Sequence, residues 1–375
     1  MGKWVLRMNK QSATGKSSRS NQRALRPIGL LIILATAYAV YHLNFKQSVG
    51  HDLFELMGTV VDIKVVVPNY VDAEELIAET RSEMEKVVDV MNAYNPESFV
   101  ARLNDLPTST PLKVEADEAI ILDVLEKSRE VSELSDGAFD ITFASVGRYW
   151  RFDPSDPRLP SDEEIERAKN RIDYRQVVID KEEGTVMLSG EETRIDLGGI
   201  AKGTVVDVAI RFLKRHGAEG ALVNAGGDMY GFGTKADGQS WTVGLQHPRK
   251  PTGTVIPGVY IRVGGREVGD FAVVTSGDYE RSFVHEGTRY HHIIDPRTGL
   301  PSSGVSSVTV ISRSAEWADA MATAIFVMGA EEGMALAENR PELEAVMITD
   351  DLEVLATSGL ADSVKGIELK IGASN

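Results

Sequence analysis

The stretch Arg194-Ile195-Asp196-Leu197-Gly198-Gly199-Ile200-Ala201-Lys202-Gly203 decides the fold, because it joins two kinds of secondary structure. Residues 194–197 predict a short strand, and residues 200–216 predict a helix with one apolar face. The paired glycines let backbone groups approach a ligand, and a helix N-terminus attracts anions. The stretch matches neither a P-loop nor the G-x-G-x-x-G fingerprint. It indicates either a phosphate-binding turn that uses Lys202, or a tight turn with a surface lysine.

Strands and helices follow one another on both sides of this stretch without strict alternation, and no internal repeat is visible. A doubly wound parallel sheet is therefore disfavoured, and the pattern predicts an α+β fold with mixed or antiparallel sheets and flanking helices. The predicted helices are 72–91, 117–135, 162–169, 315–328 and 330–339. The predicted strands are 60–67, 176–180, 185–189, 221–224, 241–246, 258–263, 271–276, 281–285, 291–294, 306–312, 345–349 and 354–357.

The charge of the chain is divided unevenly. Residues 1–50 carry eight Lys or Arg and no acidic residue, which leaves 32 of the 40 basic residues against all 56 acidic ones. A body this acidic should repel nucleic acid, so no nucleic-acid partner is expected. Cysteine is absent, which excludes disulfides, thiolate metal sites and anchoring through a lipid-modified cysteine.

The N-terminal region predicts a membrane anchor. Residues 1–26 are basic, and the apolar run 27–45 is long enough to cross roughly 28 Å. Basic residues before such a run place it in the inner membrane with a single pass, residues 1–26 in the cytoplasm and the rest on the periplasmic side. Small residues at 35–39 leave open a cleaved signal, and a buried helix of a soluble protein is a third interpretation. We expect 46–56 to be a linker and 57–375 the catalytic domain.

Two further motifs carry oxygen or imidazole groups. In Ala318-Asp319-Ala320-Met321-Ala322-Thr323-Ala324, Asp319 and Thr323 are four apart on a predicted helix and share a face, as hard-cation ligands or as an ordinary buried pair. The run 291–299, His-His-Ile-Ile-Asp-Pro-Arg-Thr-Gly, offers one histidine as a base, or only a partly exposed strand histidine. Ser276 lacks the surroundings of a serine nucleophile.

Taken in order, seven motifs resemble the signature series of the FAD:protein FMN transferases, the ApbE family. The resemblance covers roughly residues 52–350, and it is specific because the motifs occur in the family's order. They are 57–59 (Met-Gly-Thr), 136–140 (Asp-Gly-Ala-Phe-Asp), 196–203, 224–228 (Asn-Ala-Gly-Gly-Asp), 275–279 (Thr-Ser-Gly-Asp-Tyr), 292–299 and 318–324.

The resemblance implies roles for particular residues. Asp319 and Thr323 match side-chain ligands of Mg²⁺, and Gly199 matches a backbone carbonyl ligand of the same ion. His292 matches the candidate catalytic base. The positions that match the FAD site are Met57, Tyr94, Ala138, Phe139, Asp140, Asp196, Lys202, His292 and Ile293. One departure is the missing anchor cysteine, which an apolar helix would replace.

The implied reaction moves FMN from FAD, its substrate, to a Thr or Ser hydroxyl of an acceptor protein, forming a phosphoester and releasing AMP. The family suggests subunits of membrane redox complexes as acceptors. Alternatives are a pyrophosphatase that gives FMN and AMP, an extracytoplasmic FAD-binding protein, and an anchored scaffold without a ligand. The acidic body favours a cation at the diphosphate in either enzyme.

Overall fold

The computed structural model describes residues 31–38, 47–251, 253–265 and 269–362. Residues 31–38 form a short exposed helix, and most of the predicted anchor 27–45 lies outside the described residues. Within the described chain, one helix is long and apolar enough to cross a membrane, α8 (Ala315–Glu338), and half of its apolar window is buried inside the protein. Core burial explains the apolar character of α8.

An eight-stranded antiparallel sheet organises the body, which confirms the α+β prediction. Its order is β1-β2-β6-β7-β10-β13-β14-β15. The strands are β1 (Gln47–Leu56), β2 (Thr59–Pro68), β6 (Gly220–Ala225), β7 (Asp228–Gly233), β10 (Phe271–Gly277), β13 (Val305–Ser312), β14 (Leu343–Thr349) and β15 (Val354–Ala356). The prediction of a linker at 46–56 is wrong, because Gln47–Leu56 pairs along its whole length with β2 as the edge strand.

Three small sheets accompany the large one. They are the hairpin β8 (Trp241–Gln246) with β9 (Val255–Val263), the hairpin β11 (Ser282–His285) with β12 (Thr288–His291), and β3 (Leu112–Lys113), β5 (Thr185–Leu188) and β4 (Val177–Asp180) in the order β3-β5-β4. Trp241, Val243 and Val263 pack on Val66 and Val273, so β8–β9 covers one face of the large sheet.

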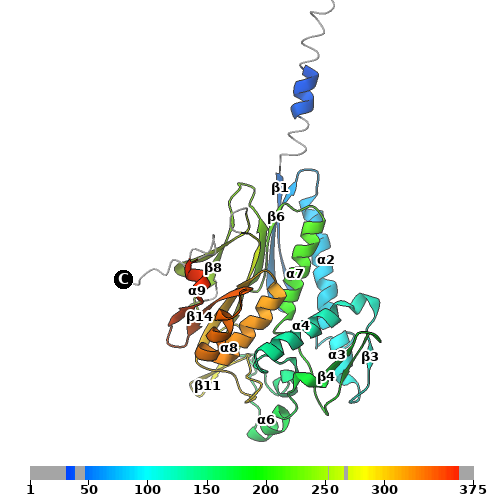
Figure 1. Cartoon of the computed structure of the whole chain (residues 1–375), viewed down its shortest axis with the longest axis vertical. Coiled ribbons are helices and arrows are strands. Elements are labelled where there is room, and N and C mark those ends of the chain that lie inside the picture. Colours follow the sequence, from blue (N-terminus) through cyan, green and yellow to red (C-terminus); the bar gives the residue numbers. More distant parts are fainter. Residues whose placement is uncertain (1–30, 39–46, 252, 266–268, 363–375) are drawn as a thin grey trace, which may run out of the picture. The chain divides into compact units, whose positions relative to one another are not determined.

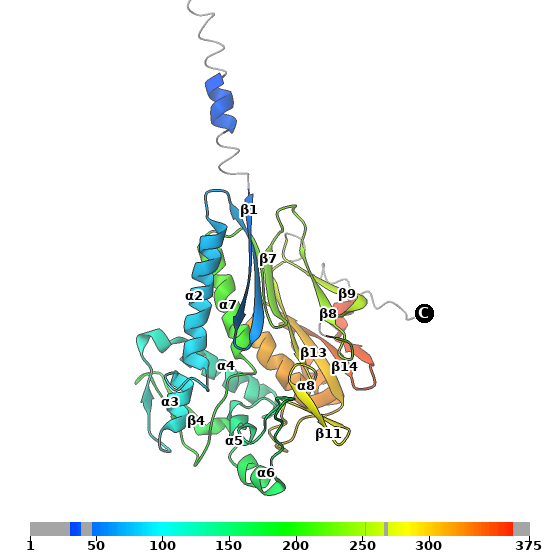
Figure 2. The ribbon, with the colours of Figure 1, turned by 180° about the vertical axis from the view of Figure 1, so that it is seen from behind.

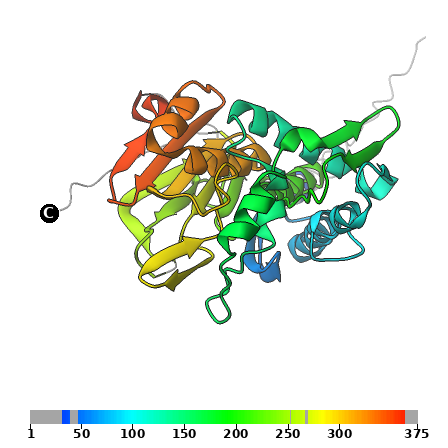
Figure 3. The ribbon, with the colours of Figure 1, turned by 90° about the horizontal axis from the view of Figure 1, so that it is seen from below.

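Helices cover the other face. Figures 1 and 2 show α2 (Ala73–Met91) and α7 (Ala201–Arg215) side by side, and α8 beside them contacts β10, β13 and β14. Viewed from below, α8 lies next to the helical region of residues 116–170 (Figure 3). The other helices are α3 (Phe99–Asp105), η1 (Ala116–Glu118), α4 (Ile120–Leu134), η2 (Ile141–Phe143), α5 (Ala144–Gly147), α6 (Asp162–Lys169), η3 (Tyr174–Gln176) and α9 (Ser358–Asp362).

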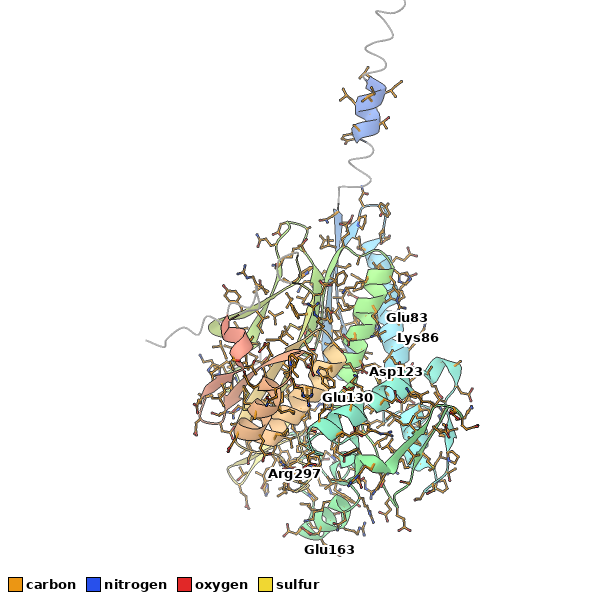
Figure 4. The ribbon with its side chains drawn as sticks, viewed as in Figure 1. Glu83, Lys86, Asp123, Glu130, Glu163 and Arg297 are labelled. Carbon is orange, nitrogen blue, oxygen red and sulfur yellow. The ribbon has the colours of Figure 1, made fainter. Side chains whose placement is uncertain are left out.

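Local chemistry explains where the long helices begin and pack. Asp72 accepts hydrogen bonds from the amides of Glu74 and Glu75, which caps α2. The outer face of α2 is charged, and Glu83 and Lys86 form an ion pair there (Figure 4). Gly50 of β1 has no side chain where a methyl group would lie 2.8 Å from Ile77, so the edge strand can approach α2 closely.

Two predictions near the site differ from the structure. Both concern strands, because the two helices predicted at 315–328 and 330–339 are confirmed: α8 joins two helices across a kink at Gly329, where φ is 81°. Residues 194–197 have no strand partners, because Asn104 and Ile141 provide their hydrogen-bond partners instead. The strand predicted at 291–294 ends at His291, in β12.

Candidate active site

The start of α7 lies against the start of α8. The turn before α7 is closed by Gly198 N–H, which donates to Asp196 Oδ1 at 2.7 Å, and by Ala201 N–H, which donates to Leu197 O at 2.8 Å. A methyl group at Gly203 would lie 2.2 Å from Ala315 O. Only glycine permits this approach, which brings the two helix N-termini to one place.

The three predicted metal-binding residues meet at this place. Asp319 is buried, and its Oδ2 accepts a hydrogen bond from Gly203 N–H at 2.9 Å. Thr323 Oγ1 lies 3.2 Å from Ser276 Oγ and 3.5 Å from where a methyl group at Gly199 would be. The residues therefore offer a carboxylate, a hydroxyl and a nearby backbone carbonyl, all oxygen donors. Among the described residues, no three His, Asp or Glu side chains gather as a metal site.

A cluster of charges surrounds Asp319. Lys202 Nζ pairs with Asp228 Oδ2, whose carboxyl group is fully buried at the start of β7. Burial, with Asp228 nearby, raises the pKa of Asp319 to about 7 against the opposing effect of Lys202. Burial also raises the pKa of Glu280 to about 7, although part of this residue is open to solvent. The cluster thus holds three carboxyl groups around one lysine.

The lysine carries its charge in spite of burial. Burial opposes the charge of Lys202, but the carboxylates of Asp228, Asp319 and Glu280 outweigh it and raise the pKa of Lys202. Burial raises the pKa of Asp228 against the opposing effects of Lys202 and of the nearby Thr275 N–H, and its buried Oδ1 atom has no hydrogen bond of ordinary length among the described residues. An unpaired oxygen in so buried a position is costly, and a bound cation or water would satisfy it.

The two adjacent histidines have different surroundings. His291 is buried, with Nε2 2.8 Å from Ser302 O and Nδ1 accepting from Ile293 N–H at 3.3 Å. The Nδ1 atom of His292 is buried without a hydrogen-bond partner in the described chain. Burial, with Arg281 and His291, lowers the pKa of His292 to about 3. His292 is therefore neutral near pH 7 and has a free nitrogen that can accept a proton.

The residues matched to the flavin form two groups. Met57, Tyr94 and Asp196 lie near Arg281. Arg281 Nη2 is 3.6 Å from where a methyl group at Gly58 would be, and its charge acts on both Tyr94 and Asp196. Tyr94 is 87% exposed, and the nearby Asp196 carboxylate raises its pKa. Burial raises the pKa of Asp196, and Gly198 N–H and Arg281 oppose that effect.

The second group is buried. Ala138, Phe139 and Ile293 belong to the main hydrophobic core, and Phe139 lies 3.1 Å from where a methyl group at Gly199 would be. Asp140 accepts hydrogen bonds from Thr142 N–H, Thr142 Oγ1 and Tyr174 N–H. Burial raises the pKa of Asp140. Its side chain therefore holds the loop together and has three protein donors.

The sequence interpretation gave no role to Asp228, Glu280 or Arg281. Asp228 ends a glycine-rich motif, and Glu280 and Arg281 directly follow another. This proximity to the motifs is the one feature of the sequence that could have indicated a role for them. Their part in the charge cluster depends on pairing between distant strands, which short sequence patterns do not report. Arg281 O also accepts a hydrogen bond from His292 N–H at 3.1 Å, which ties the two segments together.

The comparisons with known proteins agree with this arrangement. The model of the ApbE family matches residues 57–347. The FAD:protein FMN transferase of Vibrio cholerae is 34% identical over 79% of this chain and 86% of that protein, and the one of Treponema pallidum is 33% identical over 75% and 79%. The solved structure of the ApbE protein of Thermotoga maritima has a TM-score of 0.74 at 31% identity and covers 84% of this chain and 98% of that one.

The flavin transferase ApbE of Vibrio cholerae, also a solved structure, has a TM-score of 0.72 at 32% identity over 84% of this chain and 98% of that one. Fold, sequence and the order of the site motifs point to the same relatives. The chain therefore belongs to the ApbE family of enzymes.

Proposed function

We propose that this enzyme transfers FMN from FAD to a Thr or Ser hydroxyl of an acceptor protein, with release of AMP, and that the transfer depends on Mg²⁺. The observation that carries the proposal is the meeting of Asp319, Thr323 and Gly199 beside Lys202. The names of the relatives supply the substrate and the type of transfer. FAD carries an anionic diphosphate, which an otherwise acidic body can hold only at such a site.

The donor set fits Mg²⁺. Asp319 would supply a carboxylate oxygen, Thr323 its hydroxyl and Gly199 its carbonyl, and hard oxygen donors are those that Mg²⁺ prefers. A bound Mg²⁺ would offset negative charge on the diphosphate and on the departing AMP. Lys202 lies beside Asp319 and supplies a second positive charge, which Asp228 holds in place through the ion pair.

The bond changes follow from the proposed reaction. The acceptor hydroxyl oxygen bonds to the phosphorus of FMN, and the bond from that phosphorus to the oxygen of AMP breaks. His292 would take the hydroxyl proton on a ring nitrogen, because its imidazole is neutral near pH 7. An anionic diphosphate nearby would offset Arg281 and Lys202, and it would raise the pKa of His292 toward a range suited to a base.

We place the acceptor and the enzyme in the same compartment. The basic residues 1–26 and the apolar run 27–45 support an inner-membrane anchor with the catalytic body on the periplasmic side. Acceptors would then be proteins exposed there, such as subunits of membrane redox complexes.

Incubation of the full-length protein with FAD, MgCl₂ and a library of Thr- and Ser-containing peptides tests the proposal. We expect AMP in an amount equal to the peptide that gains FMN, detected by mass spectrometry, and no product after chelation of the cation. Free FMN with AMP, and no modified peptide, would support the pyrophosphatase instead. Bound FAD without AMP release would support a flavin-binding protein.

A matched pair of variants separates the site from general damage. Asp319→Asn removes the carboxylate at the centre of the cluster. Asp123→Asn makes the same change on the exposed face of α4 (Figure 4). Equal AMP release by Asp319→Asn and Asp123→Asn would refute the cation site.

A further inference from the structure

The segment from Ser276 to Arg281 brings several groups to the candidate site within six residues. Ser276 Oγ contacts Thr323 Oγ1 at 3.2 Å, Glu280 lies within the charge cluster, and Arg281 O accepts from His292 N–H. Only Ser276 and Gly277 belong to β10, so the sheet holds the segment at one end, and the bond to His292 N–H holds Arg281 at the other. Asp278 to Glu280 lie between these two attachments.

Asp278 is the point at which the segment is held from behind. The residue is 4% exposed, and its N–H donates to Ser306 O at 3.1 Å. Its carboxylate Oδ1 accepts from Arg249 Nη1 at 2.7 Å. The Asp278 side chain thus points toward Arg249, whereas Ser276 contacts Thr323 and the charge of Glu280 acts on Lys202 and Asp319.

Arg249 comes from a different part of the fold. It lies in the turn of the β8–β9 hairpin, and its side chain is 28% exposed. Its Nη2 donates to Ser306 Oγ at 2.5 Å and to Asp350 Oδ1 at 3.1 Å. Asp350 is fixed in turn, because its Oδ2 accepts from Gly304 N–H at 2.9 Å. One guanidinium therefore joins the hairpin, the loop after β10, the start of β13 and the turn after β14.

We propose that Arg249 is a positioning residue for flavin transfer, which holds Asp278 and thereby fixes Ser276, Glu280 and Arg281 at the candidate site. A planar guanidinium suits this role because its donors have a fixed geometry and can bind several acceptors at once. The inference rests on the proposed function for its activity measurement. It assigns a role to a residue that touches neither the cluster around Asp319 nor His292.

The expected consequence of losing this contact is a misplaced segment. Displacement of a positioned group by about 1 Å can cost roughly 100-fold in rate. Arg249→Gln should lower kcat/KM for FAD about 10- to 100-fold and leave the KM for an acceptor peptide unchanged. Arg249→Lys keeps the charge but loses the fork of donors, and it should recover part of the activity. Lys250→Gln, the exposed neighbouring residue, is the matched control and should behave as wild type.

Two further variants separate positioning from general stability. Asp350→Asn weakens the other half of the network and leaves the Arg249–Asp278 pair in place. Arg249→Gln combined with Asp278→Asn removes both charges together, so this variant avoids an unpaired buried carboxylate. If Arg249 acts through Asp278, the double variant should be no less active than Arg249→Gln. Asp350→Asn should keep most of its activity even where it lowers the melting temperature as much as Arg249→Gln does.

Full-length protein, FAD, MgCl₂ and an acceptor peptide are used for the kinetics. Hydrogen exchange at residues 276–281 gives a readout that needs no activity, and it should rise in Arg249→Gln but not in Lys250→Gln. The inference is overturned if Arg249→Gln matches Lys250→Gln in kcat/KM, or if Asp350→Asn loses as much activity as Arg249→Gln. Failure of the wild-type protein to modify any peptide would instead contradict the proposed function, and the exchange measurement would still decide the role of Arg249.

Discussion

The contact between α7 and α8 contains two buried aspartates with opposite surroundings. Asp207 accepts three hydrogen bonds, from Ser314 Oγ, Ala315 N–H and Glu316 N–H at 2.7–3.2 Å. Asp319 accepts one, from Gly203 N–H, and lies beside two further carboxyl groups and Lys202. The first region is saturated by protein donors and joins the helices. The second is left open to a ligand. Burial raises the pKa of both aspartates, so the difference between them lies in the number of protein donors.

This difference separates residues that stabilise from residues that act. A buried polar group with all its partners supports one packing of the helices. A buried carboxyl group with few hydrogen-bond partners lowers the stability of the folded protein, and such groups are typical of functional sites. The comparison predicts that changes in the first region alter stability, and that changes in the second alter flavin transfer.

The largest effect should come from Asp319→Asn. We expect flavin transfer to fall at least about 100-fold, because the carboxylate of the cation site is lost. Stability at pH 8 should hold or rise slightly, since a raised pKa means that the anion is disfavoured in the folded protein above pH 7. AMP release and urea denaturation of the same preparation measure the two effects. A large loss of stability would show that Asp319 stabilises the fold as Asp207 does, and it would contradict the division between the two regions.

Asp207→Ala should show the opposite pattern. It leaves the Ser314 hydroxyl and two amides at the start of α8 without their acceptor, which should cost about 2–4 kcal/mol in the free energy of unfolding. The kcat of the folded fraction at low temperature should stay within a few-fold of wild type. Asp123→Ala on exposed α4 is the control for stability. Loss of activity without loss of stability would contradict the assignment of Asp207 to the stabilising region.

His292 belongs to the open region and should make stability depend on pH. Its pKa of about 3 in the folded protein lies below the ordinary value of 6.5, so the unfolded chain binds the proton first. The stability that His292 contributes is therefore complete above pH 6.5, and it is lost as pH falls from 6.5 toward 3, by up to about 4 kcal/mol. Urea denaturation of wild type and His292→Asn across this range should show a shallower slope for the variant. Parallel curves would mean that His292 titrates normally.

The sequence was sufficient for the long helices but missed the short helix α3. Helices 72–91 and 200–216 have a strong apolar period, and the structure places them within one residue of those limits. The shared helix face of Asp319 and Thr323 was predicted because spacing on a helix is a local property, whereas their role as cation ligands stays a prediction from the family resemblance. β1 was missed because an edge strand buries little: in Gln47–Leu56, only Gly50 and Phe54 are buried.

The rest of the site depends on distant contacts. Asp228 meets Lys202 because β7 follows β6 in the sheet, and Arg249 meets Asp278 across 29 residues. No local pattern reports such pairs. Protein donors satisfy the carboxylates of Asp207 and Asp140, whereas Asp228 Oδ1 and His292 Nδ1 lack such partners among the described residues. This difference depends on the three-dimensional structure.

The smallest effect should come from Tyr94, the most exposed residue assigned to the site. Because 87% of it is exposed, Tyr94→Ser should change the free energy of unfolding by less than about 0.5 kcal/mol. Loss of an aromatic surface that stacks on a flavin or adenine ring should weaken FAD binding by about 1 kcal/mol, or roughly fivefold.

Tyr70→Ser is the matched control for Tyr94→Ser. Tyr70 is 67% exposed just beyond Pro68, at the end of β2 away from the Met57–Gly58 turn. Quenching of FAD fluorescence on titration with each variant measures the affinity. Unchanged affinity for FAD in Tyr94→Ser would exclude Tyr94 from contact with the ligand. An equally weakened affinity in Tyr70→Ser would show that the effect does not come from the predicted FAD site. If only Tyr94→Ser weakens FAD binding and its stability is unchanged, the division between residues that stabilise the fold and residues that serve the reaction also holds at the surface. There a side chain can contribute to the reaction without supporting the fold.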